Sequence, residues 1–332
     1  MRTRISVIVP VYNAEWCLRE CLLALLENHD ETTEVLVVND HSTDRSAEIA
    51  REMGVRVLEN PRGRGPATAR NVGAENALGE VLFFIDSDVK VQPDSIRHVV
   101  GFFDANPETA AMFGSYDTHP TAPNFLSQYR NLLHHYVHQN SSQNAVTFWA
   151  GCGAIRKDVF QKMGGFNEEE YPHPSIEDIA LGLELRQVGH SIRLDKSLQV
   201  THMKRWNATN LLRADIFYRA VPWSRLILKS GMLPNDLNLH TSQRVSAVMV
   251  WIFVISIAIL LSGYATVPSM CLAVLAAGTA LFLNRDLYRF FWNLKGPLFL
   301  LPAIFWHFLY YLYSSTTFLV CSLNPKRSAK KK

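Results

Sequence analysis

Two carboxylates stand one residue apart at the end of an apolar stretch. Asp86, Ser87 and Asp88 directly follow Val81–Ile85, which has the composition of a strand buried on both faces. The carboxyl end of such a strand is where open α/β sheets bind ligands. Mg²⁺ and Mn²⁺ take oxygen ligands and keep positions open for substrate phosphates, so the pair predicts a divalent-metal site. The alternative is a solvated turn, because Asp and Ser are common turn residues.

The elements that position this pair alternate between strand and helix. The apolar patterns predict strands over residues 5–11, 34–38, 55–58 and 81–85, with helices over 16–26, 45–53 and about 66–78 between them. This alternation builds a parallel sheet with right-handed crossovers. The loops at residues 10–15, 39–44 and 86–88 follow strands, so we expect them to face a common ligand.

The next hundred residues are less regular. We expect a helix over residues 94–105, an edge strand near 110–114 and a less regular region over 120–145. Its His134, His135 and His138, on a polar helix face, are expected to be solvated, and a metal site is the alternative. The segment from Trp149 to Arg156 is small and tight, as a segment against which a substrate packs would be. Short strands are predicted at 192–194 and 198–200.

A second acidic pair, Glu177 and Asp178, stands at the start of a helix predicted over residues 179–188. Carboxylates are favoured at a helix N-terminus, so one interpretation is a simple cap. A carboxylate on a rigid helix start is also a good position for a general base.

The motifs and their order resemble the family 2 glycosyltransferases, which are inverting enzymes with a GT-A-type fold. The matching pieces are Ser6-Val-Ile-Val-Pro-Val-Tyr-Asn-Ala, Val38-Asn-Asp with Ser42-Thr-Asp, Gly65-Pro-Ala-Thr-Ala-Arg-Asn-Val-Gly, Phe84-Ile-Asp-Ser-Asp, Gly164-Gly-Phe-Asn-Glu and Glu177-Asp178. The resemblance covers residues 5 to about 206. One departure is Asn39, where many members carry a second Asp.

The resemblance implies a role for each matching residue. The nucleotide-sugar is expected to contact Pro10, Tyr12, Asp40, Arg70 and Asp86, with Asp40 accepting a hydrogen bond from a pyrimidine base, which favours a UDP-sugar. A divalent metal, Mn²⁺ or Mg²⁺, is expected on Asp86 and Asp88, with His202 as a further ligand or an ordinary strand-end histidine. Asp178 is the expected catalytic base. Glu177, Trp149 and Trp206 are expected on the acceptor side, although Trp206 at the membrane face is an equal alternative.

Composition excludes some classes of protein. The net charge of +3 is too small to indicate a nucleic-acid binder, and the five cysteines show neither a disulfide framework nor a zinc site. A reducing compartment is the simpler interpretation. We see no signal peptide at the N-terminus, so we expect an N-terminal domain in the cytoplasm.

The C-terminal third has the composition of a membrane module. Residues 207–244 interleave basic and apolar residues, which predicts interfacial helices; a surface helix packed on the catalytic domain is the alternative. Three segments within residues 245–322 are near the ~20 residues that cross a bilayer, namely 245–264, 266–283 and 297–320. Three full spans would place the basic tail, 323–332, on the outer side, against the positive-inside tendency. Pro297 and Pro302 mark the last segment as a re-entrant candidate.

Taken together, the sequence predicts an α/β protein: a GT-A-type nucleotide-sugar-binding domain with a mostly parallel sheet over residues 1–206, then interfacial helices and a C-terminal transmembrane helical module. The expected activity is metal-dependent transfer of a sugar, with inversion, to a hydroxyl of a lipid-linked or membrane-proximal acceptor. The expected location is an inner membrane of bacterial type, in contact with its lipids. A polyprenyl-phosphate acceptor and a catalytically silent sugar-nucleotide-binding subunit are the alternatives.

Overall fold

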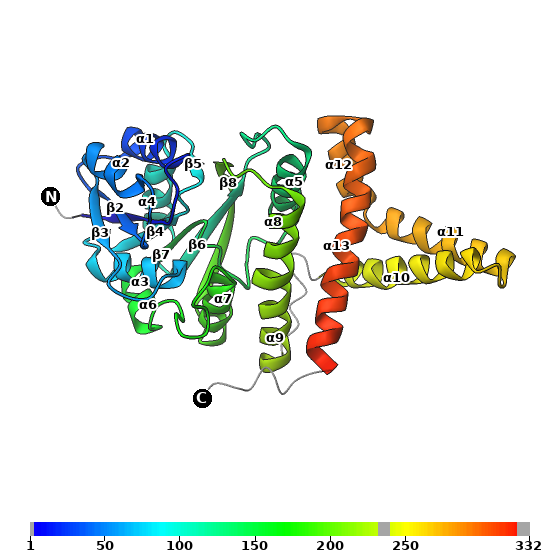
Figure 1. Ribbon diagram of the computed structural model, residues 1–332. Coiled ribbons are helices and arrows are strands. Elements are labelled where there is room, and N and C mark those ends of the chain that lie inside the picture. The colour runs from blue at the N-terminus through cyan, green and yellow to red at the C-terminus, as the bar shows by residue number, and fades with distance from the viewer. Residues whose placement is uncertain (1–2, 232–239, 324–332) are drawn as a thin grey trace. The chain divides into compact units, whose positions relative to one another are not determined.

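The computed structural model describes residues 3–231 and 240–323. Contacts within the chain divide it into two compact units, Met1–Trp206 and Asn207–Lys332. The first unit contains a single mixed sheet covered by helices, and the described secondary structure of the second consists of helices (Figure 1).

The eight strands of the sheet lie in the order β3-β2-β1-β4-β7-β6-β8-β5. Their bounds are β1 (Ile5–Val11), β2 (Thr33–Asn39), β3 (Arg56–Glu59), β4 (Val81–Ile85), β5 (Val89–Val91), β6 (Thr109–Tyr116), β7 (Cys152–Arg156) and β8 (Ser191–His202). The first four are parallel to one another. β7 runs antiparallel to both β4 and β6, β8 is parallel to β6, and β5 is antiparallel to β8. The sheet is therefore parallel in its N-terminal half and mixed beyond β4.

Helices cover both faces of the sheet, because the strands are apolar on both sides. The helices of this unit are α1 (Leu18–Asn28), α2 (Ser46–Glu52), α3 (Pro66–Asn76), α4 (Ser95–Ala105), α5 (Phe125–Asn140), α6 (Lys157–Lys162) and α7 (Glu177–Gln187). One core packs α1, α2 and α4 against side chains such as Val7, Val9 and Phe83. The other packs α3, α6 and α7 against Ile8, Leu82 and Phe84. All five residues of β4 are buried, and the strand carries Asp86 to the sheet edge.

The four N-terminal strands lie where the apolar pattern predicts them, whereas the second half of the unit differs from expectation. β6 is an interior strand instead of an edge strand, since β7 and β8 flank it. The two short strands expected near 192–200 form one strand of 12 residues, β8. The region expected to be irregular contains α5, a helix of 16 residues.

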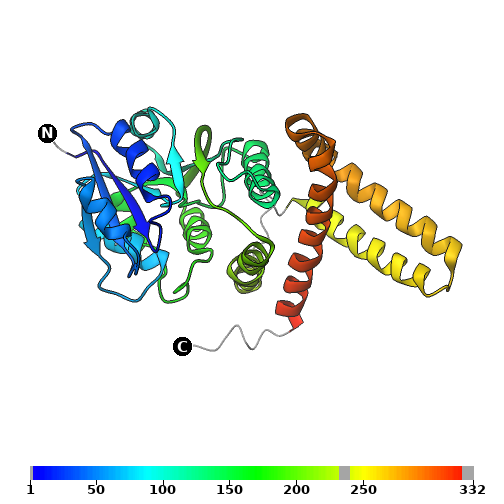
Figure 2. The ribbon, with the colours of Figure 1, turned by 45° about the horizontal axis from the view of Figure 1, so that its top comes forward.

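The second unit consists of helices α8 (Ala208–Arg213), the π-helical segment η1 (Ala214–Ala220), α9 (Val221–Ser230), α10 (Thr241–Leu261), α11 (Thr266–Leu283), α12 (Arg285–Lys295) and α13 (Pro297–Leu323). Among the described residues, α10, α11 and α13 are long and apolar enough to cross a membrane. α10 and α11 form a hairpin, and small buried side chains of α11, Ser269, Ala273, Ala276 and Ala280, allow the two helices to pack closely. α13 runs across this hairpin instead of alongside it (Figures 1 and 2).

Candidate active site

The turn that carries Asp86 and Asp88 is held by contacts from three sides. The amide of Asp86 donates to the carbonyl of Gly151 at 3.2 Å, and the amide of Val89 closes the turn on the carbonyl of Asp86 at 3.0 Å. Two thiols donate to the same turn. Cys17, which directly precedes α1, donates to the carbonyl of Ser87 at 3.3 Å, and Cys21 of α1 donates to that of Asp86 at 3.8 Å. Specific contacts therefore hold the backbone of this turn, while the carboxylates of Asp86 and Asp88 remain partly exposed.

Asp88 faces two nitrogen groups from the end of β8. Its Oδ2 lies 3.8 Å from Nε2 of His202 and 3.6 Å from Nζ of Lys204. Burial alone would raise the pKa of the Asp88 carboxyl, but contact with His202 and Lys204 holds that pKa well below its usual range. Asp88 is thus an anion that favours a cation at this position.

His202 rests on an aromatic platform. The rings of His202 and Tyr116 stack with centroids 4.3 Å apart at an interplanar angle of 12°. Trp149 meets Tyr116 edge-on at 4.9 Å, and His134 packs against both rings. The platform fixes the imidazole plane of His202 next to Asp88.

The histidines of α5 do not face solvent as expected. His138 is 6% exposed and lies 3.1 Å, by Nδ1, from the carbonyl of Gly114. Burial lowers its pKa to about 4, so it is neutral at physiological pH. His134 and His138 pack against Trp149, and His135 is in hydrogen-bond contact with the carbonyl of Tyr116. The prediction of a solvated histidine is therefore wrong for His138, which is buried, whereas His134 and His135 are half-buried.

The residues around Asp88 fit a hard divalent cation in their chemistry. Asp86 and Asp88 offer carboxylate oxygens and His202 an imidazole nitrogen, a set that Mn²⁺ accepts. Within residues 3–231 and 240–323, however, no three His, Cys, Asp or Glu side chains are close enough together to form a complete protein site. Substrate phosphate oxygens would have to supply further ligands, as is common for Mg²⁺ and Mn²⁺.

Asp178 is positioned by both its helix and the loop before β7. It is the second residue of α7, its Oδ1 accepts from the amide of Ile179 at 2.8 Å, and its Oδ2 accepts from the amide of Ala150 at 2.9 Å. Burial raises the pKa of this carboxyl to about 7, and the charge of Glu177 contributes to the increase. The side chain is half-buried, so one face remains accessible. A rigid carboxylate with a pKa near neutrality has the properties of a general base.

Arg70 joins the two acidic pairs. Its guanidinium, 6% exposed, donates to Oδ1 of Asp86 at 2.7 Å and to Oε1 of Glu177 at 2.8 Å. Glu177 is also buried and accepts from the amide of Ser175 at 3.0 Å. The structure thus places Glu177 in a buried ion bridge, a position that the sequence interpretation did not anticipate for an acceptor-side residue.

The residues expected to hold a nucleotide base lie at the ends of β1 and β2. Pro10 is half-buried near the end of β1, Tyr12 follows with a 45% exposed ring, and the guanidinium of Arg64 covers that ring at 4.5 Å. Asp40 is buried, and its two oxygens accept from Nδ2 of Asn60 at 2.7 Å and from the amide of Gly65 at 2.9 Å. Asp40 therefore fixes the glycine-rich loop beside Tyr12.

Gly65 has a packing reason to be glycine. A Cβ on Gly65 would lie 2.5 Å from the backbone oxygen of Pro172. This close approach brings the loop before α7 against the loop before α3, so the segments that carry Asp40, Arg70 and Asp178 are packed as one structure.

The two tryptophans expected on the acceptor side differ in environment. Trp149 is half-buried in the platform described above. Trp206 is 5% exposed; its amide donates to Oγ of Ser127, its carbonyl accepts from Asn124, and Nζ of Lys204 lies 4.8 Å from its ring. Trp206 is therefore fixed against the start of α5.

Sequence reasoning missed several residues that shape the site. These are Cys17, Cys21, Asn60, Tyr116 and the backbone amide of Ala150. None of them belongs to a motif with its own chemistry. The weak signal for Ala150 was the run of small residues after Trp149, which permits a close approach of α7.

Comparison with known proteins identifies the N-terminal part of the chain. Residues 6–164 match the family model Glycosyl transferase family 2. This span contains Asp40, Arg70, Asp86 and Asp88 but ends before Asp178.

Curated relatives are similar over short stretches. An uncharacterized glycosyltransferase of Haemophilus influenzae is 37% identical over 103 residues, 30% of this chain and 41% of the relative. Glycosyltransferase GlyA of Streptococcus pneumoniae is 41% identical over 98 residues, 28% of this chain and 14% of GlyA. This chain spans less than half of the length of either relative.

Solved structures share the fold over most of the chain. The mannosyltransferase PcManGT from Pyrobaculum calidifontis, in complex with GDP-Man and Mn²⁺, superposes with a TM-score of 0.61 at 18% identity, over 96% of this chain and 88% of PcManGT. TarS residues 1–349 of S. aureus, in complex with UDP-GlcNAc, superpose with a TM-score of 0.53 at 18% identity, over 93% of this chain and 89% of TarS 1–349. The fold of the first unit is therefore of the GT-A type, as the sequence predicts.

Proposed function

Because residues 6–164 form a glycosyltransferase family 2 domain, we propose that this protein is an inverting glycosyltransferase. It transfers a sugar from a nucleoside diphosphate donor to a hydroxyl group of a lipid-linked or membrane-proximal acceptor. Its catalytic domain lies on the cytoplasmic side of a membrane of bacterial inner-membrane type, and the apolar helices α10, α11 and α13 support the membrane location.

The observation that carries this proposal is the environment of Asp178. Its carboxylate is held by two backbone amides and has a pKa raised to about 7 by burial and by Glu177. In a single displacement the acceptor oxygen bonds to the anomeric carbon while the bond from that carbon to the diphosphate oxygen breaks. Asp178 accepts the proton that the acceptor hydroxyl loses. The acceptor attacks the anomeric carbon on the face opposite the leaving diphosphate, so this single displacement inverts the configuration. It needs one base and no carboxylate nucleophile.

Negative charge on the leaving diphosphate is balanced on the Asp86 side of Arg70, away from Glu177 and Asp178. Asp86, Asp88 and His202 would hold a divalent metal, which when bound stabilises the negative charge that develops on the leaving group. Lys204 lies beside Asp88 and adds a positive charge next to the same place. Arg70 keeps Asp86 in position through its buried ion pair.

We propose a UDP-sugar as the donor. Asp40 and Tyr12 directly follow the neighbouring strands β2 and β1. A pyrimidine imide near Tyr12 would donate to an oxygen of Asp40, each of which already accepts one hydrogen bond, from Asn60 or from Gly65. The structure of TarS contains UDP-GlcNAc and that of PcManGT contains GDP-Man, so a donor screen has to include both bases.

The experiment is sugar transfer in membranes that contain the full chain. Labelled UDP- and GDP-sugars are supplied with Mn²⁺, and label is measured in extractable lipid; the anomeric configuration of the product is compared with that of the donor. We expect transfer with inversion, and a loss of about 10²- to 10⁴-fold in Asp178→Asn. Asp158→Asn, which changes an exposed carboxylate of α6, is the matched control. Full activity in Asp178→Asn, or retention of configuration, would contradict the proposal.

The same experiment separates the two alternatives. A polyprenyl-phosphate acceptor gives a product that mild acid hydrolyses, because the sugar is then linked through a phosphate ester, whereas a glycoside survives. A catalytically silent subunit binds the donor but transfers no label with any sugar. The raised pKa of Asp178 favours an active enzyme, because a binding subunit has no need of a base.

A further inference from the structure

The helix α13 makes contacts that a third membrane-spanning helix would not make. Its central residue Tyr311 donates through its hydroxyl to Oε1 of Gln243 at 2.6 Å and lies 2.9 Å from Oδ1 of Asn284. Gln243 is the third residue of α10, and Asn284 directly follows α11. Both therefore mark the open end of the hairpin, where its two helices enter and leave the same side of a bilayer.

Tyr311 lies far along α13 from the start of the helix. Tyr311 lies 14 residues after Pro297, about 21 Å along a helix. A spanning α13 that entered at Pro297 would therefore bring Tyr311 about two thirds of the way through a ~30 Å hydrocarbon core, far from the side on which the open end of the hairpin lies. Tyr311 instead bonds to Gln243 and Asn284 at that open end. The nearby Phe308 and Ser315 contact Phe253 and Trp251 in the middle of α10, so a short stretch of α13 meets half the length of α10, as in a helix that crosses the hairpin.

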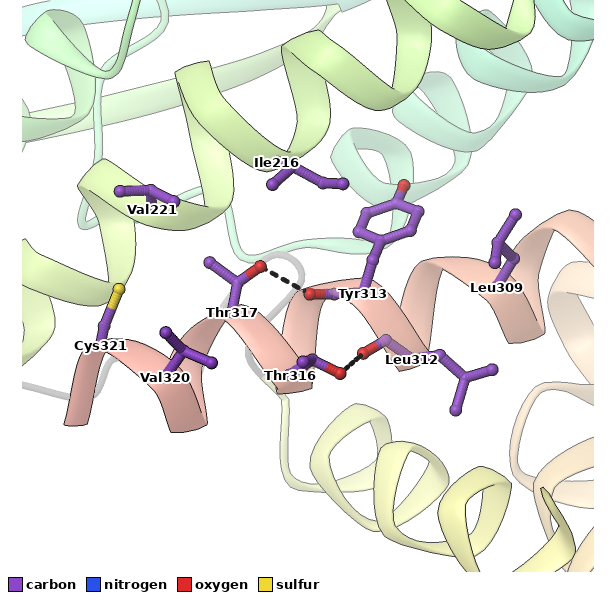
Figure 3. A pocket seen from close by; sticks show the side chains of 9 residues that line it. All are labelled: Ile216, Val221, Leu309, Leu312, Tyr313, Thr316, Thr317, Val320 and Cys321. Atoms are coloured by element: carbon purple, nitrogen blue, oxygen red, sulfur yellow. Dashed lines mark hydrogen bonds between the residues drawn. The ribbon is translucent and has the colours of Figure 1, made fainter. Parts of the chain in front are cut away.

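α13 also contacts η1 and α9, the helices that precede the hairpin in the sequence. Asp215 of η1 accepts from the hydroxyl of Tyr313 at 2.6 Å and from Arg219 at 2.8 Å. An apolar groove of about 460 Å³ lies between these helices, lined by Ile216, Val221, Leu309, Leu312, Tyr313, Thr316, Thr317, Val320 and Cys321 (Figure 3). Tyr313 projects from α13 toward the helix that carries Ile216.

The contact between Tyr313 and Asp215 would be unfavourable in free energy if α13 were perpendicular to the bilayer. Tyr313 lies about 24 Å beyond Pro297 along the helix. The Asp215–Arg219 pair would then be drawn deep into the hydrocarbon, where charged side chains are strongly disfavoured. If α13 lies at the interface, the same pair stays at the level of the headgroups and the apolar groove faces the acyl chains.

The composition of α13 also suits an interface. Trp306, Tyr310, Tyr311 and Tyr313 lie in its middle, and Trp and Tyr are residues of the membrane–water interface, not of the bilayer centre. Its mean hydropathy is the lowest of the three long apolar helices. Leu298, Leu301 and Phe305 are exposed along its first two turns and are available to lipid.

We propose that, among the described helices, only α10 and α11 cross the bilayer and that α13 lies in the membrane plane, in the leaflet that faces the catalytic domain. This inference rests on the proposed membrane location. It places both ends of α13, and with them Arg285, Arg289 and Lys295 of α12, on the side of the catalytic domain. The basic tail, residues 323–332, lies almost entirely outside the described residues, and the side of the membrane on which it lies stays a prediction.

The test is the accessibility of single cysteines in the full chain. Cys271→Ser and Cys321→Ser are introduced first, while Cys17, Cys21 and Cys152 are buried and remain. Leu78→Cys reports the side of the catalytic domain, Tyr264→Cys the hairpin tip and Leu323→Cys the end of α13; all three positions are exposed. A membrane-impermeant maleimide is applied to sealed vesicles of both orientations.

We expect Leu323→Cys to be labelled in the same vesicles as Leu78→Cys, and Tyr264→Cys in the opposite ones. Labelling of Leu323→Cys together with Tyr264→Cys would show three spans and overturn the proposal, as would labelling of all three from one side. A spin label at Leu298, Phe305 or Leu319 adds a measurement of depth, which we expect to be shallow and similar at all three positions. A depth that increases steadily along α13 would also overturn the proposal. If the protein is found in the soluble fraction, the membrane location itself is refuted. Sugar transfer is measured separately in each variant, so that a failure of the proposed activity is distinguished from a failure of the proposed topology.

Discussion

At the scale of single residues, the site is organised by one buried guanidinium. Arg70 contacts Asp86 on one side and Glu177 on the other, and Glu177 adjoins Asp178. The carboxylate that is expected to bind the metal is thereby joined, through Arg70, to Glu177, the neighbour in sequence of the expected base. Motif reasoning assigned Arg70 to the donor, whereas its described hydrogen bonds are to protein carboxylates.

The first prediction concerns pH. Asp178 acts as a base only when deprotonated, and its pKa is raised to about 7, so kcat/KM should fall about tenfold per pH unit below that value. Burial is the main cause, with Glu177 next, while Arg70 and the amides of Ala150 and Ile179 oppose the shift. Glu177→Gln removes the like charge and should move the acid limb to lower pH. A profile with its acid limb near pH 4 in the unmodified chain, or a limb that Glu177→Gln leaves in place, would contradict this role.

The second prediction concerns the stability of the bridge. Arg70→Ala leaves the buried carboxylate of Glu177 and the partly exposed carboxylate of Asp86 without their cation, which should lower the free energy of unfolding by about 3 kcal/mol. Denaturant unfolding followed by tryptophan fluorescence measures the change. Arg97→Ala is the matched control, because Arg97 forms an exposed pair with Asp94 and should cost no more than about 1 kcal/mol. Equal effects of the two substitutions would show that the buried bridge contributes little.

At the scale of secondary structure, the sequence predicted the strands whose residues are apolar on both faces. β1, β2 and β4 are of this kind, and their buried patterns follow directly from composition. β7 was missed because Cys152-Gly-Ala-Ile-Arg is short and small. Its Gly153 is required by tertiary contact, since a Cβ there would lie 2.3 Å from the backbone oxygen of Trp149.

The helix α5 was expected only as a polar helix face in a less regular region. Its buried residues include the polar Ser127, Asn131 and His138 beside Leu132 and Leu133, so a hydropathy pattern does not reveal its inward face. The ion bridge through Arg70 was also beyond sequence reasoning, because Arg70 and Glu177 are 107 residues apart and carry no local signal of their pairing. Carboxylates at strand and helix ends were predictable; the residues that set their charge were not.

The third prediction concerns how closely α7 packs on the loop that supports Asp178. A Cβ on Gly182 would lie 2.2 Å from the backbone nitrogen of Phe148, so Gly182→Ala must push α7 away from that loop. We expect a loss of about 1 to 3 kcal/mol in stability and reduced kcat, because the hydrogen bond from Ala150 to Asp178 is strained. Gly101→Ala in α4 meets nothing within 4 Å and should stabilise by about 0.5 to 1 kcal/mol. If Gly182→Ala were as harmless to stability and kcat as Gly101→Ala, the close packing of α7 on the loop at Phe148 would be refuted.

At the scale of the whole molecule, the chain combines a domain of GT-A-type fold with helices that are apolar enough to cross a membrane. The division after Trp206 separates the sheet from the apolar helices. Charge is distributed accordingly, with no Lys, Arg, Asp or Glu between residues 245 and 283. The site therefore belongs to a domain with an ordinary soluble composition, and attachment is a property of the second unit.

The fourth prediction concerns this attachment. Because α10 and α11 are long and apolar enough to cross a bilayer, alkaline carbonate and high salt should leave the full chain in the membrane pellet. The double variant Arg285→Gln and Arg289→Gln weakens only the electrostatic contribution of α12 and should also remain in the pellet. Release of the unmodified chain by carbonate would show that it lies on the surface of the bilayer.

The thiols beneath the Asp86–Asp88 turn have a consequence for chemical sensitivity. Burial raises the pKa of Cys17 to about 12, with a contribution from Asp88, and raises that of Cys21 as well. Both remain protonated and therefore poorly nucleophilic at neutral pH. Although two sulfur atoms lie directly under its acidic turn, this active site should withstand alkylating agents and peroxide, so inhibition by such reagents would report unfolding and not modification of the folded enzyme.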